Sequence, residues 1–197
     1  MDFLPFIQAF VLLLVIMDPL VSMAAFLSMT KDLDKRQRNM VATKAAVVAA
    51  VPLFLFLVFG NVLLEIMKVD IQTFKAAGGL ILVLLGVQLS LGVSFRKSEG
   101  DEDPRDVSAI ASVIGTPLIT GPATISATIM LANEFGMVVT GIAGVAALAV
   151  IWITLMAGSL VYRYLGHTGI RVLSTMMGLV TIAWGVAFLK SGFFGAG

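Results

Sequence analysis

Cysteine is absent from this sequence, and histidine occurs once, at His167. Without cysteine there are no disulfides, no thiolate metal ligands and no cysteine nucleophile. The sequence also lacks the His-Glu-x-x-His, Gly-x-Ser-x-Gly and Walker patterns, and no polar stretch is long enough to bind a nucleotide. We therefore expect no enzyme, no ATP-driven pump, and no metal or organic cofactor.

Charged residues are also scarce. They make up 13% of the 197 residues, whereas hydrophobic residues make up 59%. Soluble domains contain about 25% charged and about 45–50% apolar residues. The mean hydropathy is +1.03, and a net charge of +1 offers no basic surface for nucleic acid. This composition is typical of an all-α polytopic membrane protein, whose partner is the lipid bilayer.

Long apolar runs are what the sequence does contain. A helix that spans the hydrocarbon core needs about 20 mostly apolar residues, and six segments meet that length. They run roughly over 3–29, 39–62, 71–91, 107–132, 137–162 and 169–190. The longest polar interval, 93–106, predicts a linker between a unit at 1–92 and a unit at 107–197.

The basic residues are unevenly distributed between the polar intervals. Nine follow the first, third and fifth spans, namely Lys31, Lys35, Arg36, Arg38, Arg96, Lys97, Arg105, Arg163 and Arg171. The opposite side has Lys68, Lys75 and Lys190. The positive-inside rule then predicts a multi-pass protein of the cell membrane, with those three loops, the linker among them, cytoplasmic and both termini outside.

One carboxylate lies deep in an apolar segment. Of twelve acidic residues, Asp18 alone is far from the ends of the predicted spans. A charge near the bilayer centre costs about 2.5–3.5 kcal/mol on insertion scales, and Pro19 removes a helix hydrogen bond. The pair predicts an interrupted helix. Asp18 is expected to cap the helix that restarts, to contact a ligand or coupling ion, or to do both.

The same pattern returns about one hundred residues later. Pairs at similar spacing are Pro19 and Pro117, Gly60 and Gly158, Gly79 and Gly178, and Gly86 and Gly185, separated by 98 or 99 residues. They predict a three-helix unit that occurs twice, and an odd number of spans inverts the second copy. The first and fourth helices are then both discontinuous, which is typical of secondary transporters.

Each helix that restarts after an interruption presents unpaired N–H groups, which suit a carboxylate. With Asp18 nearby, the site would match a small zwitterion. Hydroxyl groups at Ser22, Thr120 and Thr124 flank it, although such residues also serve helix packing. An exporter of other metabolites or drugs and a channel remain alternatives on the same scaffold, and the oligomeric state is left open.

These residues together resemble the MarC family of integral membrane proteins, which includes transporters of small neutral amino acids. The resemblance rests on Asp-Pro at 18–19, Thr-Pro-Leu-Ile-x-Gly-Pro at 116–122 and Gly-Gly-Leu at 78–80. It implies carriage of glycine or alanine driven by a gradient of H⁺ or Na⁺. By position, the implied site is Asp18, Pro19, Ser22, Thr116, Pro117, Thr120, Gly121 and Pro122. The sequence departs from the family pattern at Val21, Ser22, Ala24 and Ala123.

Overall fold

The computed structural model describes residues 3–91 and 107–194. Within these ranges the chain is helical and contains no strand. The elements are α1 (Phe3–Met17), α2 (Pro19–Met29), α3 (Lys35–Ile66), α4 (Ile71–Leu91), α5 (Val107–Val113), the π-helical turn η1 (Ile114–Ile119), α6 (Pro122–Phe135), α7 (Met137–Met156) and α8 (Gly158–Phe194). The predicted linker at 93–106 lies outside the described residues.

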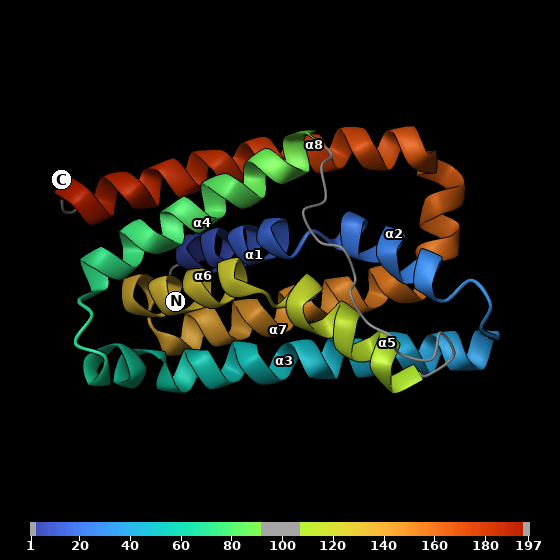
Figure 1. The fold of residues 1–197 in the computed structure, drawn as a ribbon, viewed down its shortest axis with the longest axis horizontal. Helices are drawn as coiled ribbons and strands as arrows, with labels where there is room; N and C mark the ends of the chain where they lie inside the picture. Colours follow the sequence, from blue (N-terminus) through green and yellow to red (C-terminus); the bar gives the residue numbers. More distant parts are fainter. Residues whose placement is uncertain (1–2, 92–106, 195–197) are drawn as a thin grey trace.

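The helices lie lengthwise in a bundle whose interior holds α1 and α6 (Figure 1). Helices α4 and α8 run side by side along one edge, and α3 runs along the opposite edge. Helix α1 contacts α6, α7 and α8, and α6 contacts α1, α3, α4 and α7. Side chains such as Leu12, Leu13, Met130 and Leu131 are fully buried there. Helices α1 and α6, which adjoin the predicted interruptions, therefore each pack against several other helices.

Five helical segments are long and apolar enough to cross a membrane. They are Phe3–Met29, Lys35–Ile66, Ile71–Leu91, Met137–Met156 and Thr168–Phe194, and each matches a predicted span. The remaining predicted span, 107–132, is not one helix, because it divides into α5, η1 and α6. Large apolar side chains such as Val51, Leu55 and Phe59 of α3 are exposed, as expected for helices that face lipid.

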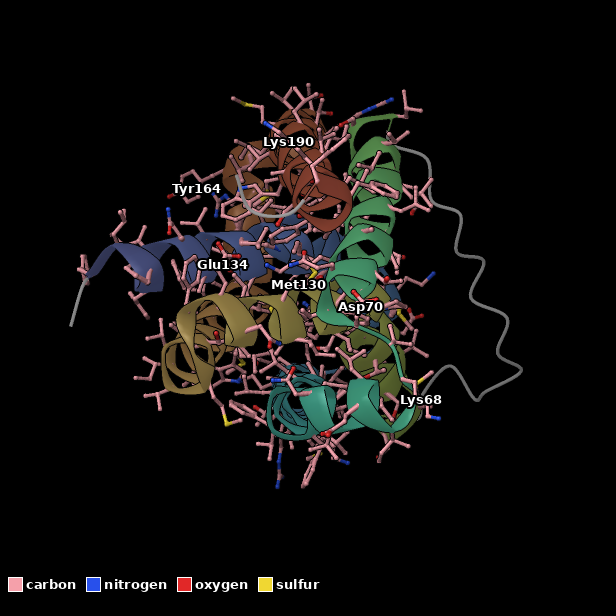
Figure 2. All side chains as sticks on the ribbon, turned by 90° about the vertical axis from the view of Figure 1, so that its left-hand side faces the viewer. Lys68, Asp70, Met130, Glu134, Tyr164 and Lys190 are labelled. Atoms are coloured by element: carbon pink, nitrogen blue, oxygen red, sulfur yellow. The ribbon has the colours of Figure 1, made fainter. Side chains whose placement is uncertain are left out.

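The two ends of the bundle carry different connections. The start of α1, the α3–α4 and α6–α7 connections and the end of α8 lie at the left in Figure 1, and the α2–α3 connection lies at the right. Figure 2 looks onto the left end and labels Lys68 and Asp70 of the α3–α4 connection, together with Glu134 and Lys190. The predicted first-to-second and second-to-third loops thus lie at opposite ends.

Helices α4 and α8 approach so closely that their backbones touch. A Cβ atom added to Gly79 would lie 2.7 Å from the carbonyl oxygen of Gly185, and one added to Gly86 would lie 2.6 Å from that of Gly178. The sequence predicts that these glycines, seven residues apart in each helix, share a face that admits another helix. The structure shows that the two glycine faces meet each other.

Candidate solute-binding site

The first interruption is centred on Asp18. Its backbone has left-handed geometry, with φ 37° and ψ 83°, and separates α1 from α2. Its Oδ1 atom accepts hydrogen bonds from the N–H groups of Leu20 (3.2 Å) and Val21 (3.1 Å). Asp18 is therefore the N-cap of α2. The expectation that the start of α2 presents free N–H groups is wrong for these two donors, because Asp18 itself satisfies them.

The other carboxylate oxygen has no such partner. Asp18 is 4% exposed, and no described residue forms a hydrogen bond with its Oδ2 atom. Beyond the cap, the carboxyl group interacts with the side chain of Ser174 in α8, although the two form no hydrogen bond of ordinary length. The hydroxyl of Ser174 is also buried and unpartnered. Ser174 was not predicted from the sequence, because one serine in an apolar helix carries no distinguishing pattern.

The second interruption is longer and differently built. Inside η1, Thr116 has extended backbone angles of φ −143° and ψ 117°, and the helix does not restart until Pro122. Gly121 occupies the N-cap position of α6, where it provides no side-chain hydrogen bond. Thr116 and Pro122 are exposed, and Gly121 is half-buried. Pro117, which the sequence pairs with Pro19, lies within η1, so Pro122 is the proline that begins the second restart.

Helix α3 anchors this second interruption. The Thr120 hydroxyl donates to the carbonyl oxygen of Ala49 at 2.8 Å, and Thr120 is fully buried. At the start of η1, a Cβ atom on Gly115 would lie 2.7 Å from the carbonyl oxygen of Ala45. The backbone of η1 is thus pressed against α3, and a glycine is needed for the close approach.

Two predicted site residues make matching hydrogen bonds across the interruptions. The Ser22 hydroxyl donates to the carbonyl of Met17, and the Thr124 hydroxyl donates to the carbonyl of Ile119, each at 3.1 Å. Both hydroxyls reach back five residues to a carbonyl that the interruption frees. Ser22 and Thr124 are buried. Their hydroxyls are therefore used to stabilise the interruptions.

The elements that carry the predicted site residues are in contact. Helix α1 packs on α6, and α2 packs on η1. In contrast, an open groove of about 330 Å³ lies between α3 and α5, lined by Thr43, Lys44, Val47, Val48, Ser108, Ala111 and Ser112. None of the predicted site residues lines this groove. Among the residues that the structure describes, no cluster of three or more His, Cys, Asp or Glu side chains could hold a metal ion.

Apolar helices with interrupted backbone in the interior define the class of the molecule, an integral membrane protein with several membrane-spanning helices. The model of the family described as MarC family integral membrane protein matches residues 3–196. The chain therefore belongs to the MarC family, as the sequence resemblance predicts.

Membrane proteins from several organisms are similar to this chain over most of their length. A UPF0056 membrane protein of Methanocaldococcus jannaschii is 30% identical, with 100% of this chain and 99% of the relative covered. The UPF0056 inner membrane protein YhgN of Escherichia coli is 31% identical, with 89% of each chain covered. A UPF0056 membrane protein of Aquifex aeolicus is 29% identical over 95% of this chain and 91% of its own. No solved structure matches the chain significantly.

Proposed function

We propose that this protein is a secondary active transporter of small neutral amino acids of the size of glycine and alanine. The solute is held between the interruption at Asp18 and the interruption that ends at Pro122. Six membrane crossings form two inverted repeats of three helices, in which the α5–η1–α6 segment is the fourth crossing. The observation that carries the proposal is the matched pair of hydrogen bonds from Ser22 and Thr124, because it gives both interruptions the same local design.

Further correspondences support the inverted repeat. Lys68 and Gly166, 98 residues apart, both have a positive φ angle, of 55° and 61°. Lys68 lies in the connection between α3 and α4, and Gly166 lies at a kink inside α8. The contacts of α4 with α8 are reciprocal, since Gly79 meets Gly185 and Gly86 meets Gly178. Such reciprocity is what a two-fold axis between equivalent helices produces.

The two interruptions supply complementary chemistry. Asp18 provides a buried carboxylate, which suits an ammonium group or a coupling ion. The first turn of α6 has no side-chain cap, and its N–H groups and helix dipole favour an anion. A solute with one positive and one negative end matches this arrangement. The buried hydroxyls of Ser22, Thr120 and Thr124 restrict its size.

The transport cycle would use a gradient of H⁺ or Na⁺, with Asp18 as the candidate for coupling. Because YhgN is an inner membrane protein by name, we place this protein in the cell membrane as well. The distribution of lysine and arginine favours cytoplasmic loops after the first, third and fifth crossings. Both termini would then lie outside.

The proposal is tested with purified protein in liposomes. We expect uptake or exchange of radiolabelled glycine and alanine that responds to an imposed H⁺ or Na⁺ gradient. Protein-free liposomes serve as the control. Absence of uptake under either gradient would reject the amino-acid assignment. Uptake of bulky drugs in place of amino acids would favour the exporter, and current in planar bilayers far above carrier turnover would favour a channel.

A further inference from the structure

The two carboxylate oxygens of Asp18 have different surroundings. Its Oδ1 atom caps α2 through Leu20 and Val21, whereas its Oδ2 atom is buried and accepts no hydrogen bond from any described residue. The hydroxyl of Ser174 lies beside the same carboxyl group, and it too is buried and unpartnered. Buried polar atoms without partners cost free energy, and a buried charge costs the most. A group that binds both oxygens would remove this cost.

We propose that Asp18 Oδ2 and Ser174 Oγ together bind the primary ammonium group of the solute, so that α8 contributes to the binding site. This inference rests on the proposed function and adds the residue that recognises one end of the substrate. Since Asp18 lies before α2 and Ser174 lies in α8, the bound ammonium bridges two packed helices.

The number of donors and acceptors fits this group. A primary ammonium has three N–H donors, of which one can reach the charged Oδ2 atom and one the Ser174 hydroxyl. Oδ1 is already occupied by two backbone donors. Within the part of the chain that the structure describes, the carboxyl group interacts with Leu20, Val21 and Ser174 and with no charged side chain. The charge that balances Asp18 is therefore expected to arrive with the ligand.

A metal ion fits the pair less well. Hard cations such as Ca²⁺ and Mg²⁺ take about six or more oxygen ligands, and the two side chains supply one free oxygen each. An ammonium group needs fewer partners because its hydrogen bonds to a carboxylate are charge-assisted and strong. The ammonium assignment also predicts a specificity, since complete methylation of the nitrogen removes the N–H groups from which the two oxygens accept hydrogen bonds.

Purified protein tests the pair through the dissociation constants of glycine, N-methylglycine and N,N,N-trimethylglycine, measured by titration calorimetry. We compare wild type, Asp18→Asn and Ser174→Ala. The matched control is Thr140→Val, because the Thr140 hydroxyl of α7 is equally buried and unpartnered but does not act on Asp18. Asparagine at position 18 retains an oxygen that can cap α2, so the variant is expected to fold.

We expect Ser174→Ala to weaken glycine binding about 10- to 100-fold, the range for loss of one hydrogen bond to a charged group. Asp18→Asn should weaken it further, and Thr140→Val should leave it unchanged. Trimethylglycine, which has no N–H donor, should bind the wild type at least about 100-fold more weakly than glycine, by the loss of two such bonds. Equal effects of Ser174→Ala and Thr140→Val, or tight binding of trimethylglycine, would overturn the assignment.

A second measurement separates this inference from the proposed function. If wild type binds neither glycine nor alanine, the amino-acid proposal fails, but thermal unfolding still tests the pair with methylammonium and tetramethylammonium chlorides. Stabilisation of wild type by methylammonium alone, lost in Ser174→Ala, would support the ammonium site. In the opposite outcome, sodium chloride raises the unfolding temperature more than choline chloride does, only when both Asp18 and Ser174 are present, while methylammonium has no effect. That result would show that the pair binds sodium and not an ammonium group.

Discussion

The two interruptions satisfy their backbone in different ways. At the first, a single residue, Asp18, leaves helical geometry, and its side chain caps the helix that follows. At the second, η1 and two further residues precede α6, and the cap position is a glycine. Support there comes from another helix, because Thr120 donates to Ala49 of α3. The first interruption is buried, and the second is partly exposed at Thr116 and Pro122.

Because of this difference, the two interruptions provide groups of opposite polarity to a bound solute. The first interruption contributes a carboxylate oxygen and no free N–H group at Leu20 or Val21. The second contributes the uncapped first turn of α6 and no ionisable side chain. A backbone design used twice is thus paired with groups of opposite preference, a carboxylate at the first interruption and backbone N–H groups at the second. That asymmetry is what a zwitterionic solute would require of the two halves.

The largest effect on glycine uptake is expected from substitution of Asp18, where two variants distinguish the helix-capping role of the side chain from the role of its charge. Asp18→Asn keeps an oxygen that can accept from Leu20 and Val21 but removes the charge, so glycine uptake should fall at least about 100-fold with little loss of stability. Asp18→Ala should also lower the free energy of unfolding by about 1 kcal/mol, because the cap is lost. Uptake in liposomes and thermal unfolding in detergent measure the two effects.

Unchanged uptake in Asp18→Asn would reduce Asp18 to its structural role as a helix cap. The second interruption would then have to supply all of the recognition, and the comparison between the two would lose its functional meaning. Equal thermal stability of Asp18→Ala and Asp18→Asn would instead show that the cap contributes little.

The first interruption could be located from the sequence to the residue. A carboxylate is costly in the hydrocarbon core, and the proline after it removes a helix hydrogen bond. The position of this pair inside an apolar run therefore predicts where the helix is interrupted. The sequence does not predict which carboxylate oxygen of Asp18 caps α2 and which has no partner, because this depends on the left-handed backbone at Asp18. Ser174 was missed because its interaction with Asp18 depends on how α8 packs against α1 and α2, which are distant in the sequence.

The second interruption lies in the segment that the sequence predicts, but the proline that the repeat pairs with Pro19 is not the one at which the helix restarts. The shift of 98 residues selects Pro117, whereas the helix restarts at Pro122, 103 residues after Pro19. Ser22 and Thr124, whose bonds match, are 102 residues apart. A π-helical turn such as η1 accommodates extra residues within a helical path, and no residue pattern in a single sequence specifies it.

A smaller effect is expected from crowding the second interruption against α3. In Gly115→Ala the new Cβ atom would lie 2.7 Å from the carbonyl oxygen of Ala45, and backbone has to move. Such overpacking costs about 1–3 kcal/mol, so the unfolding temperature should fall by several degrees. Gly141→Ala is the matched control, since its Cβ atom would meet the end of the flexible Leu57 side chain at 3.2 Å. Similar losses in both variants would argue against close packing at η1 as the cause.

A still smaller and equal effect is expected from the matched hydroxyls. Ser22→Ala and Thr124→Val each remove one hydrogen bond to a carbonyl, which should cost about 1 kcal/mol. The double variant should show additive losses if each bond stabilises its own interruption. Strong non-additivity in denaturant or thermal unfolding would show instead that the two interruptions are coupled energetically. If only one of the two variants lowers the free energy of unfolding, the matching hydrogen bonds do not stabilise the two interruptions equally.

The smallest effect is expected at Asp70, an exposed aspartate whose side chain accepts from the start of α4 as that of Asp18 does from the start of α2. Both of its oxygens have partners, including the Thr73 hydroxyl at 2.6 Å. That hydroxyl and the N–H groups of Thr73 and Gln72 hold the pKa of Asp70 below its usual value. Its stabilising contribution is thus present above the ordinary aspartate pKa of about 3.9 and is lost as pH falls through the lower native value.

Thr73→Val should move the Asp70 pKa back toward its ordinary value, as followed by NMR titration of the carboxyl carbon, and should leave glycine uptake unchanged. Asp70→Asn should lower the unfolding temperature slightly at neutral pH, and the difference from wild type should vanish in acid. Loss of uptake in either variant would mean that an exposed cap matters for transport as much as the buried one. Capping alone would then account for Asp18, and its unpartnered oxygen would need no ligand.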